Sequence, residues 1–366
     1  MRSQKVAGAL VERIRALVDR PVSLMEVCGT HTVAISRWGL RSLMPQELRL
    51  LSGPGCPVCV TPVSGIDRAI AAARLPGVAV VTFGDMMRVP GSSSSLESER
   101  AGGADVRIVY SPLEALAAAR AEPGREVVLV GVGFETTSPA IAATVVRAER
   151  EGVRNLSVLP LFKLVPPALE VLARVPGRPL DGFLCPGHVS VIIGARAYEP
   201  VAERFGIPCV VAGFEPVDIL AGVAMLLAQA QRARDDSGKA EVETQYRRAV
   251  TPEGNPAALR LLDEVFEVCD AEWRGIGAIP RSGYAFRERF RAFDAVARLG
   301  LPETRVPDES GCVCGEIMLG LRQPPDCPLF GTRCAPRTPV GPCMVSSEGA
   351  CAAFHRYEMS GGADGR

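Results

Sequence analysis

The stretch EVVLVGVGFETTSP, residues 126–139, contains the pattern on which the fold assignment depends. An uninterrupted apolar run at 126–132 is followed by a Gly-Phe-Glu turn and then by an Ala-rich, helix-like stretch at 139–150. A short continuous apolar run beside a helix-like segment is typical of a strand that is buried on both faces of a parallel sheet. We therefore predict a strand, a loop and a helix, in this order.

The same alternation recurs along most of the chain. Further strands are predicted at seven stretches: 22–27, 48–52, 78–83, 105–110, 156–161, 182–185 and 208–213. Helices are predicted between most of them, at 64–74, 112–121, 166–174 and 216–233. Aliphatic strands that alternate with helices indicate an α/β protein whose parallel sheets are covered by helices on both faces.

Eight strands are compatible with one large sheet or with two sheets of four. We prefer two similar α/β/α domains, residues 22–121 and 122–235, which are divided near AEPGR, residues 121–125. The C-terminal region, 251–360, is predicted to form a third, loop-rich domain, together with the N-terminal helix in residues 1–21. A loop-rich domain of this kind has only a small apolar core, so we expect a metal cluster to stabilise it.

The third domain has its own pattern of elements. Within it we expect a helix over 256–270, a Gly/Pro-rich turn at EWRGIGAIPRSGY, residues 272–284, and a short helix over 285–299. The stretch 301–350 contains many prolines and shows little periodicity, so we expect it to be mostly loop.

Composition excludes several classes of partner. Of the 366 residues 47% are hydrophobic, and the formal net charge is +0, with no basic stripe for nucleic acid and no polybasic tail for a membrane. The first twenty residues predict an amphipathic helix rather than a signal peptide. No stretch reaches the roughly 18–20 apolar residues that a membrane helix needs. We expect a cytoplasmic protein with no nucleic-acid or membrane partner.

Unusual motifs begin where the predicted strands end. CGTHT follows 22–27, GPGCPVC follows 48–52, GFETTSP follows 126–132, and CPGHVS begins at the end of 182–185. Open parallel sheets bind ligands beyond the carboxyl ends of their strands. We therefore expect these motifs to face one cleft, or two clefts that face each other.

Twelve cysteines are many for a cytosolic chain, in which disulfides are rare. Half of them lie close to the C-terminus: Cys312, Cys314, Cys327, Cys334, Cys343 and Cys351. The region lacks the two CxxC pairs of a typical structural zinc site. Single cysteines spread over a Pro/Gly-rich loop suit a cubane iron–sulfur cluster, in which each thiolate binds one iron. Zinc binding and inert thiols stay as alternatives.

Three further cysteines lie near the N-terminus. Cys28 follows a strand and precedes His31 by three residues, so the two side chains could share a soft or borderline metal such as iron. His31 could instead be the base that forms the thiolate, or could bind only the loop backbone. Cys56 and Cys59 form a CxxC motif, which favours a redox dithiol. If this pair were instead half of a zinc site, further ligands would be needed nearby, and the plausible ones are Cys28, Cys185 and His188.

Two other residues have positions typical of a site. Glu135, in GFETTSP, is interpreted either as a proton-handling carboxylate or as the carboxylate of a helix N-terminus. His188, in CPGHVS, follows Pro-Gly at a strand end. GVGFE lacks the third glycine of a dinucleotide-binding fingerprint, so we exclude that interpretation.

Taken together, the motifs closely resemble the HypD family of hydrogenase maturation factors. The resemblance extends from about residue 22 to 357 and rests on seven motifs: MEVCGTHT, GPGCPVCVTP, TFGDMMRVPGS, GFETTSP, CPGHVS, EWRGIGAIPRSGY and the C-terminal CVCGEIM…CPLFG…GPCMVSSEGAC. It implies a scaffold, formed with a small HypC-type chaperone, on which the Fe(CN)2CO unit of [NiFe]-hydrogenase is assembled as cargo. A HypE-type partner would deliver the cyanide.

The resemblance also implies roles for particular residues. It implies a third domain with a [4Fe-4S] cluster, iron held by Cys28 together with a cysteine of the HypC-type partner, and assistance from His31. It further implies that Cys56 and Cys59 act as a thiol/disulfide pair linked to the cluster. For the cluster ligands we choose Cys327, Cys334, Cys343 and Cys351, and keep Cys312 and Cys314 in reserve.

The chemistry of these residue types is consistent with the roles that the resemblance implies. Soft thiolates suit low-spin iron that carries cyanide and CO, and a cubane with a dithiol stores one and two electrons. We expect electrons to pass from the cluster through Cys56 and Cys59 to iron on Cys28. The protein would then be a scaffold that turns over little free substrate. The competing hypotheses are a self-standing CxxC thiol oxidoreductase, for which no nicotinamide or flavin fingerprint is present, and a zinc-stabilised binding module.

Overall fold

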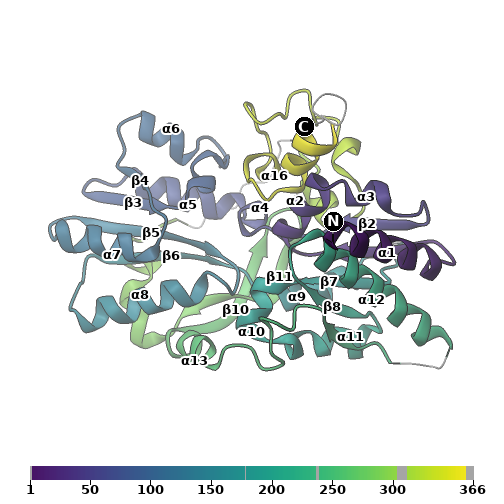
Figure 1. The fold of residues 1–366 in the computed structure, drawn as a ribbon. Coiled ribbons are helices and arrows are strands. Elements are labelled where there is room, and N and C mark those ends of the chain that lie inside the picture. Colours follow the sequence, from purple (N-terminus) through teal and green to yellow (C-terminus); the bar gives the residue numbers. More distant parts are fainter. Residues whose placement is uncertain (1, 178, 236–238, 303–310, 360–366) are drawn as a thin grey trace.

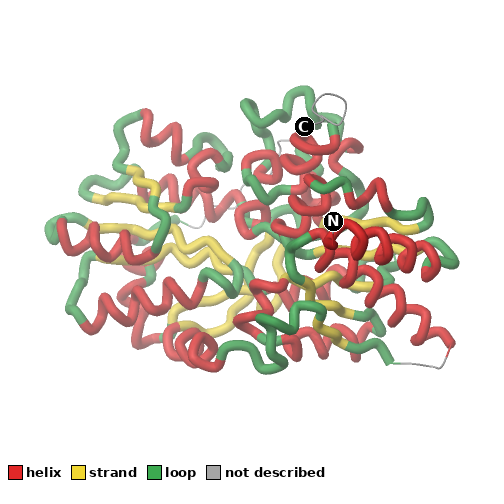
Figure 2. The backbone as a smooth tube through the Cα atoms, viewed as in Figure 1, coloured by secondary structure: helices red, strands yellow, loops and turns green. Residues whose placement is uncertain are grey.

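The computed structural model describes residues 2–177, 179–235, 239–302 and 311–359. Within these ranges the strands form two parallel sheets and an antiparallel hairpin (Figures 1 and 2). The five-stranded sheet has the order β2-β1-β7-β8-β9, and the four-stranded sheet the order β4-β3-β5-β6. The strands are β1 (Val22–Glu26), β2 (Leu48–Ser52), β3 (Val78–Thr82), β4 (Val106–Ile108), β5 (Glu126–Gly133), β6 (Leu156–Phe162), β7 (Gly182–Pro186), β8 (Cys209–Ala212), β9 (Val242–Thr244), β10 (Phe266–Trp273) and β11 (Gly277–Phe286).

Helices cover both sheets, as the α/β pattern predicts. The α-helices of the sheet region are α1 (Arg2–Leu17), α2 (Gly29–Arg37), α3 (Leu40–Leu43), α4 (Pro57–Val60), α5 (Val63–Ala73), α6 (Leu96–Ala101), α7 (Pro112–Ala121), α8 (Ser138–Arg150), α9 (Val165–Leu172), α10 (Gly187–Ile193), α11 (Glu199–Phe205), α12 (Pro216–Asp235) and α13 (Pro256–Val265). The C-terminal ones are α14 (Ala295–Leu299), α15 (Cys314–Met318), α16 (Pro342–Val345) and α17 (Ala350–Ala353). No helix among the described residues is long and apolar enough to cross a lipid bilayer.

The prediction of two parallel sheets is confirmed, but the predicted division of the strands between them near 121–125 is wrong. β1 pairs with β2 and with β7, so the five-stranded sheet combines strands from 22–121 with strands from 122–235. Likewise, β3 pairs with β5, across the predicted boundary. A buried parallel strand looks the same beside any parallel neighbour, so the alternation of strands and helices does not reveal where the chain changes sheet.

The two sheets share their apolar packing with the hairpin. One face of the five-stranded sheet packs against α1 and α12, and the other joins a core that contains Trp273 and Ile279 of the hairpin. Phe266 and Phe286, from the same hairpin, belong to the core between the four-stranded sheet and α7 and α8. In Figure 1 the hairpin lies between the two sheets.

The first part of the predicted segment 251–360, residues 256–299, differs in detail from the prediction. The helix expected over 256–270 ends at Val265, where β10 begins, and the turn expected at 272–284 is the bend and second strand of the hairpin. Strand β11 continues to Phe286, so the helix expected over 285–299 is reduced to a 3₁₀-helix, Glu288–Phe293, and α14. The cysteine-rich region, residues 311–359, is mostly loop and short helices, as expected, and lies above α2 and α4 in the view of Figure 1.

Candidate functional site

Cys28 lies at the carboxyl end of β1, where the backbone turns into α2. It is the residue before the first turn of that helix, and its side chain is buried. Because β1 and β7 are neighbours in the sheet, CPGHVS lies beside this loop, and the Cys28 Sγ is 3.9 Å from Nδ1 of His188. Burial raises the pKa of the Cys28 thiol and lowers that of the His188 imidazole. A protonated thiol therefore faces a neutral ring.

His31 is fully buried one turn into α2. Its Nε2 lies 2.9 Å from the carbonyl oxygen of Gly213, which can only accept, so Nε2 carries the proton. Burial lowers the pKa of His31 to about 4, so the ring is neutral near pH 7, with a lone pair on Nδ1. Among the described residues this Nδ1 has no hydrogen-bond partner. The rings of His31 and His188 both pack against Phe214.

Glu26, which was not among the residues predicted from sequence, supports the Cys28 loop. Its carboxylate is buried in β1 and accepts hydrogen bonds from Thr32 Oγ1 at 2.6 Å and from the Cys28 backbone N–H at 3.1 Å. Burial raises the pKa of Glu26 to about 7. Glu26 could have been recognised from the sequence. It is a charged residue in a mostly apolar strand, two positions before Cys28, and such a residue needs a buried partner.

The CxxC motif lies at the end of the neighbouring strand, β2. Cys56 is the residue before α4, and its Sγ accepts a hydrogen bond from the Cys59 backbone N–H at 3.4 Å. Both side chains are buried, and burial raises the pKa of the Cys59 thiol. The structure thus brings both thiols to the first turn of a short helix in their reduced form.

The Cys28 loop and the CxxC loop are in direct contact. The Gly29 N–H donates to the Gly55 carbonyl oxygen at 2.8 Å. A Cβ on Gly55 would overlap the backbone of Cys28, so only glycine permits this approach. The prediction that motifs at strand ends meet is confirmed for these two loops and for CPGHVS.

The C-terminal segment covers both loops. Cys56 Sγ donates to Ser346 Oγ at 3.2 Å, and Ser346 Oγ donates to Asp85 Oδ2 at 3.0 Å. Asp85 belongs to the 3₁₀-helix Gly84–Arg88, in the motif TFGDMMRVPGS. Thr30 of α2 donates to Glu348 Oε1 at 2.7 Å. The motif MVSSEGAC is therefore the link between Cys28, the CxxC motif and the four-stranded sheet.

The cysteines of the C-terminal region share one apolar core with Cys56 and Cys59. Cys343 forms thiol hydrogen bonds with Cys314 and with Cys59, and these bonds lower the pKa of Cys343. Cys351 interacts electrostatically with a different group: Cys312, Cys314, Cys327 and Cys334. Among the described residues, no three His, Cys, Asp or Glu side chains are placed as a ready set of metal ligands. None of the twelve cysteines, all of which lie in the described residues, forms a disulfide.

Glu135 lies apart from these thiols. Its Oε1 accepts the backbone N–H of Val165, the first residue of α9, at 2.9 Å. Pro166 and Pro167 follow and have no N–H, so this is the first N–H of the helix that needs an acceptor. Burial raises the pKa of Glu135 to about 7, and its Oε2 has no partner among the described residues. These contacts favour the helix-terminal interpretation of Glu135.

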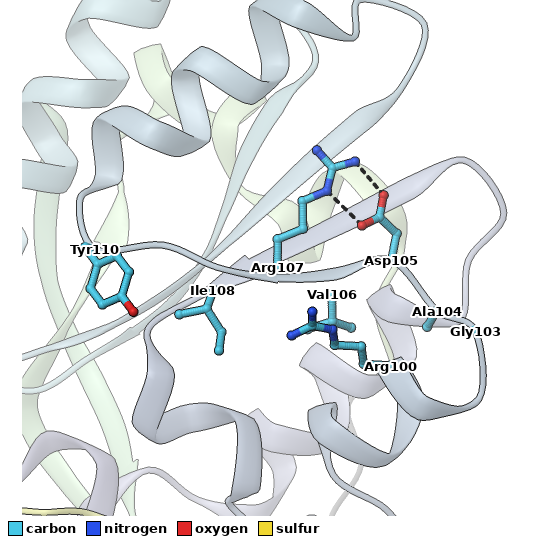
Figure 3. A pocket seen from close by; sticks show the side chains of 8 residues that line it. All are labelled: Arg100, Gly103, Ala104, Asp105, Val106, Arg107, Ile108 and Tyr110. Carbon is cyan, nitrogen blue, oxygen red and sulfur yellow. Dashed lines mark hydrogen bonds and ion pairs between the residues drawn. The ribbon is translucent and has the colours of Figure 1, made fainter.

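A surface pocket of about 660 Å³ lies at the free edge of the four-stranded sheet, beside β4 (Figure 3). Arg107 forms hydrogen bonds with Asp105 at 2.8 and 2.6 Å along its wall, and Tyr110 is exposed at its end. None of the predicted site residues lines this pocket. The candidate site is therefore the buried thiol region and not the pocket.

Fold and site together define a class: a thiol-rich α/β protein in which an isolated cysteine, a dithiol and a cysteine-rich tail meet at the carboxyl ends of parallel strands. The family model described as "HypD: Hydrogenase formation hypA family" matches residues 5–358. The chain is 46% identical to "Hydrogenase maturation factor HypD2" of Bradyrhizobium diazoefficiens, over 97% of this chain and 95% of that protein. It is equally similar to "Hydrogenase maturation factor HypD" of Azotobacter vinelandii and 45% identical to the protein of that name from Cupriavidus necator. The chain belongs to the HypD family.

Proposed function

We propose that this protein acts in [NiFe]-hydrogenase maturation, as a scaffold on which the Fe(CN)2CO unit is assembled. The names of its relatives support the process, since they are hydrogenase maturation factors. The observation that supports a scaffold is the meeting of Cys28, the CxxC loop and the cysteine-rich tail in one buried region.

Cys28 is the proposed anchor for the iron, with a cysteine of a HypC-type chaperone as the second thiolate. Binding of iron replaces the thiol proton, which has to leave a buried site. The neutral His188 ring, with Nδ1 3.9 Å from Sγ, is the proposed acceptor for that proton. His31 and Glu26 hold the loop by their bonds to Gly213, Thr32 and the Cys28 N–H.

Cys56 and Cys59 are the proposed dithiol. In the proposed relay, oxidation of this pair to a disulfide would pass two electrons to the iron unit on Cys28 and release two protons, and the bond from Cys56 through Ser346 to Asp85 offers a route for one proton. The cluster would then reduce the disulfide again, one electron at a time. Cys59 also contacts Cys343, whose pKa is lowered by its hydrogen bonds from Cys314 and Cys59. A thiol with a lowered pKa is the better nucleophile in thiol–disulfide exchange near neutral pH. Cys343 is therefore placed to connect the dithiol with the C-terminal cysteines.

The donors of the C-terminal region fit an iron–sulfur cluster in kind, because they are buried or half-buried thiols outside any disulfide and are gathered at one apolar core. A bound [4Fe-4S] cluster supplies one-electron redox chemistry. The contacts favour a ligand set that differs from the sequence-based choice by one residue. Cys351 interacts with Cys314, Cys312, Cys334 and Cys327, whereas Cys343 forms thiol hydrogen bonds with Cys314 and Cys59, so Cys314 is common to both groups. We propose Cys312, Cys327, Cys334 and Cys351 as ligands, with Cys343 in the relay.

The partners follow from the family resemblance: a small HypC-type chaperone and a HypE-type protein that delivers cyanide. The alternative of a self-standing thiol oxidoreductase is less compatible with the CxxC geometry. Cys56 and Cys59 are 4% and 2% exposed, so a free substrate would not reach them without a rearrangement. We keep a cytoplasmic location as part of the proposal, since twelve free thiols suit a reducing compartment.

The assignment of Cys28 is tested by infrared spectroscopy of the chain co-purified anaerobically with its small partner. We expect Cys28→Ala to lose the cyanide and CO bands while the visible absorbance of the iron–sulfur cluster persists. Cys269→Ala is the matched control, because it removes a half-buried thiol on β10, away from these loops. Survival of the bands in Cys28→Ala would show that another residue holds the iron.

A further inference from the structure

Three segments of the chain enclose Cys28, whose side chain is only 1% exposed. The loop after β7 contributes His188, whose Nδ1 lies 3.9 Å from the Cys28 Sγ. The loop after β2 contributes Gly55, which lies against the Cys28 backbone. The third segment, residues 346–348, belongs to the C-terminal region and lies beside the residue that follows Cys28. A reactant in solution therefore reaches the Cys28 thiol only if one of these segments moves.

Residues 346–348 lie directly on the first turn of α2. A Cβ added to Gly29 would be 2.5 Å from the Cβ of Glu348 and 3.0 Å from its Oε2. The Thr30 hydroxyl donates to Glu348 Oε1 at 2.7 Å. Burial raises the pKa of the Cys28 thiol, and the charge of Glu348 raises it further, so the carboxylate acts on Sγ itself. The half-buried Glu348 side chain thus lies between Cys28 and solvent.

Of the three segments, residues 346–348 are the easiest to displace. The loops after β2 and β7 continue directly from strands that pair with β1 in the five-stranded sheet. Residues 346–348 instead lie between α16 and α17, which have four residues each. Side-chain hydrogen bonds hold the segment to Thr30 and to Asp85. Each such bond contributes little to stability, so local opening costs much less than unfolding of the sheet.

We infer that residues 346–348 form a lid over Cys28, which opens locally, and that the hydrogen bond between Thr30 and Glu348 is its latch. The lid is flanked by Cys343 and Cys351, which belong to the apolar core, so its movement is confined to the few residues between them. The lid controls access to the thiol whatever the reactant is. That it admits iron and the partner's thiolate rests on the proposed function.

The rate at which iodoacetamide alkylates Cys28 measures the opening, because a buried thiol reacts only in molecules that expose it. The full chain is purified anaerobically without its partner, and mass spectrometry quantifies the alkylated peptide that contains Cys28. Thr30→Val and Glu348→Ala remove the latch, whereas Thr30→Ser keeps it. Thr144→Val is the matched control, since it removes a hydroxyl hydrogen bond of 2.8 Å within α8, at the four-stranded sheet.

We expect Cys28 to react about tenfold faster in Thr30→Val and in Glu348→Ala, because the loss of one hydrogen bond raises the open fraction by about this factor. Thr30→Ser and Thr144→Val should react at the wild-type rate. The double variant should react no faster than Glu348→Ala alone, since both changes remove the same bond. Thr30→Val keeps the carboxylate, so its effect cannot come from the loss of negative charge beside the thiol.

Two results would overturn the lid. Wild-type rates in Thr30→Val and Glu348→Ala would show that reagents reach Cys28 without passing residues 346–348. An equal acceleration in Thr144→Val would show that a general loss of stability, and not release of the latch, exposes the thiol. Alkylation requires no iron, so both results are distinguishable from a failure of the proposed function. Survival of the cyanide and CO bands in Cys28→Ala would remove the role of the lid in iron entry but not the lid.

Discussion

Cys343 differs from the other buried thiols of the site. Hydrogen bonds from Cys314 and Cys59 lower its pKa, whereas burial raises the pKa values of Cys59 and Cys351. A thiol that two neighbours stabilise as a thiolate suits exchange with a disulfide. This property separates Cys343 from Cys312 and Cys351, two of the proposed cluster ligands, whose pKa values are raised.

Single Cys→Ser variants, scored by iron per chain after anaerobic purification, test this separation. We expect Cys312→Ser and Cys334→Ser to lose most of the iron, because each removes a proposed ligand. Cys343→Ser should keep it. Iron retained in Cys312→Ser and lost in Cys343→Ser would restore the ligand set chosen from sequence.

Glu135 makes the stability of the protein depend on pH. Its pKa is about 7 in the folded chain and 4.5 as the reference value, so its stabilising contribution is present below pH 4.5 and is lost as the pH rises through 7. We expect Glu135→Gln, which keeps an acceptor for the Val165 N–H, to be more stable than the wild type at pH 8 by about 1–3 kcal/mol. The difference should vanish toward pH 4. Denaturant unfolding at pH 8 and pH 4 measures this difference in the free energy of unfolding. An equal difference at both pH values would show that ionisation of the buried Glu135 does not cause it.

Sequence identified most residues of the site, but not all of their contacts. Cys28, Cys56 and Cys59 follow apolar strands closely, so their meeting at one sheet edge was predictable. The approach of His188 to Cys28 depends on the pairing of β7 with β1, across more than 150 residues of chain, which no local pattern reveals. Glu26 was overlooked because it lies within the strand rather than after it.

At the scale of elements, the eight predicted strands and the five predicted helices of the sheet region are present within a few residues of their expected bounds. Their apolar periodicity is strong, because both faces of a parallel sheet are buried. The hairpin was not predicted because its glycines and proline were interpreted as loop residues. Gly275 lies in the turn between β10 and β11, and Gly277 and Pro280 lie in β11. Aromatic pairs between its strands, such as Phe266 with Phe286, hold it together instead.

The contact between the Cys28 loop and the CxxC loop is tested by Gly55→Ala. Its new Cβ would overlap the backbone of Cys28, which cannot move away as a flexible side chain can. We expect a loss of about 1–3 kcal/mol in the free energy of unfolding. Gly124→Ala is the control, since a Cβ there meets nothing within 4 Å and its effect should be close to zero. Equal effects in the two variants would mean that the loops do not touch.

Across the whole molecule, the C-terminal segment joins parts that are distant in sequence. It contacts α2 through Glu348, the CxxC motif through Ser346 and the four-stranded sheet region through Asp85. The hairpin contributes to two cores at once. The three regions predicted from sequence therefore do not act as independent units, and the site exists only where they meet.

Asp85→Ala tests this docking. The carboxylate accepts hydrogen bonds from Ser346 Oγ, Ser347 Oγ and the Ser347 N–H, and its removal leaves these donors without their acceptor. We expect a local loss of about 1–3 kcal/mol, seen as faster amide hydrogen exchange over residues 342–351. The strands of both sheets should keep their protection. Glu12→Ala is the control, because it removes only an exposed ion pair with Arg15. Unchanged amide hydrogen exchange over residues 342–351 in Asp85→Ala would show that Asp85 does not hold the C-terminal segment in place.

The central claim is that an Fe(CN)2CO unit is assembled on this chain. Infrared spectroscopy of the wild-type protein, co-purified with its small partner from anaerobic cells that express the maturation system, tests it most directly. We expect stretching bands of both cyanide and CO on a brown, iron-containing complex. A colourless complex with stoichiometric zinc, or a brown one without these bands, would contradict it.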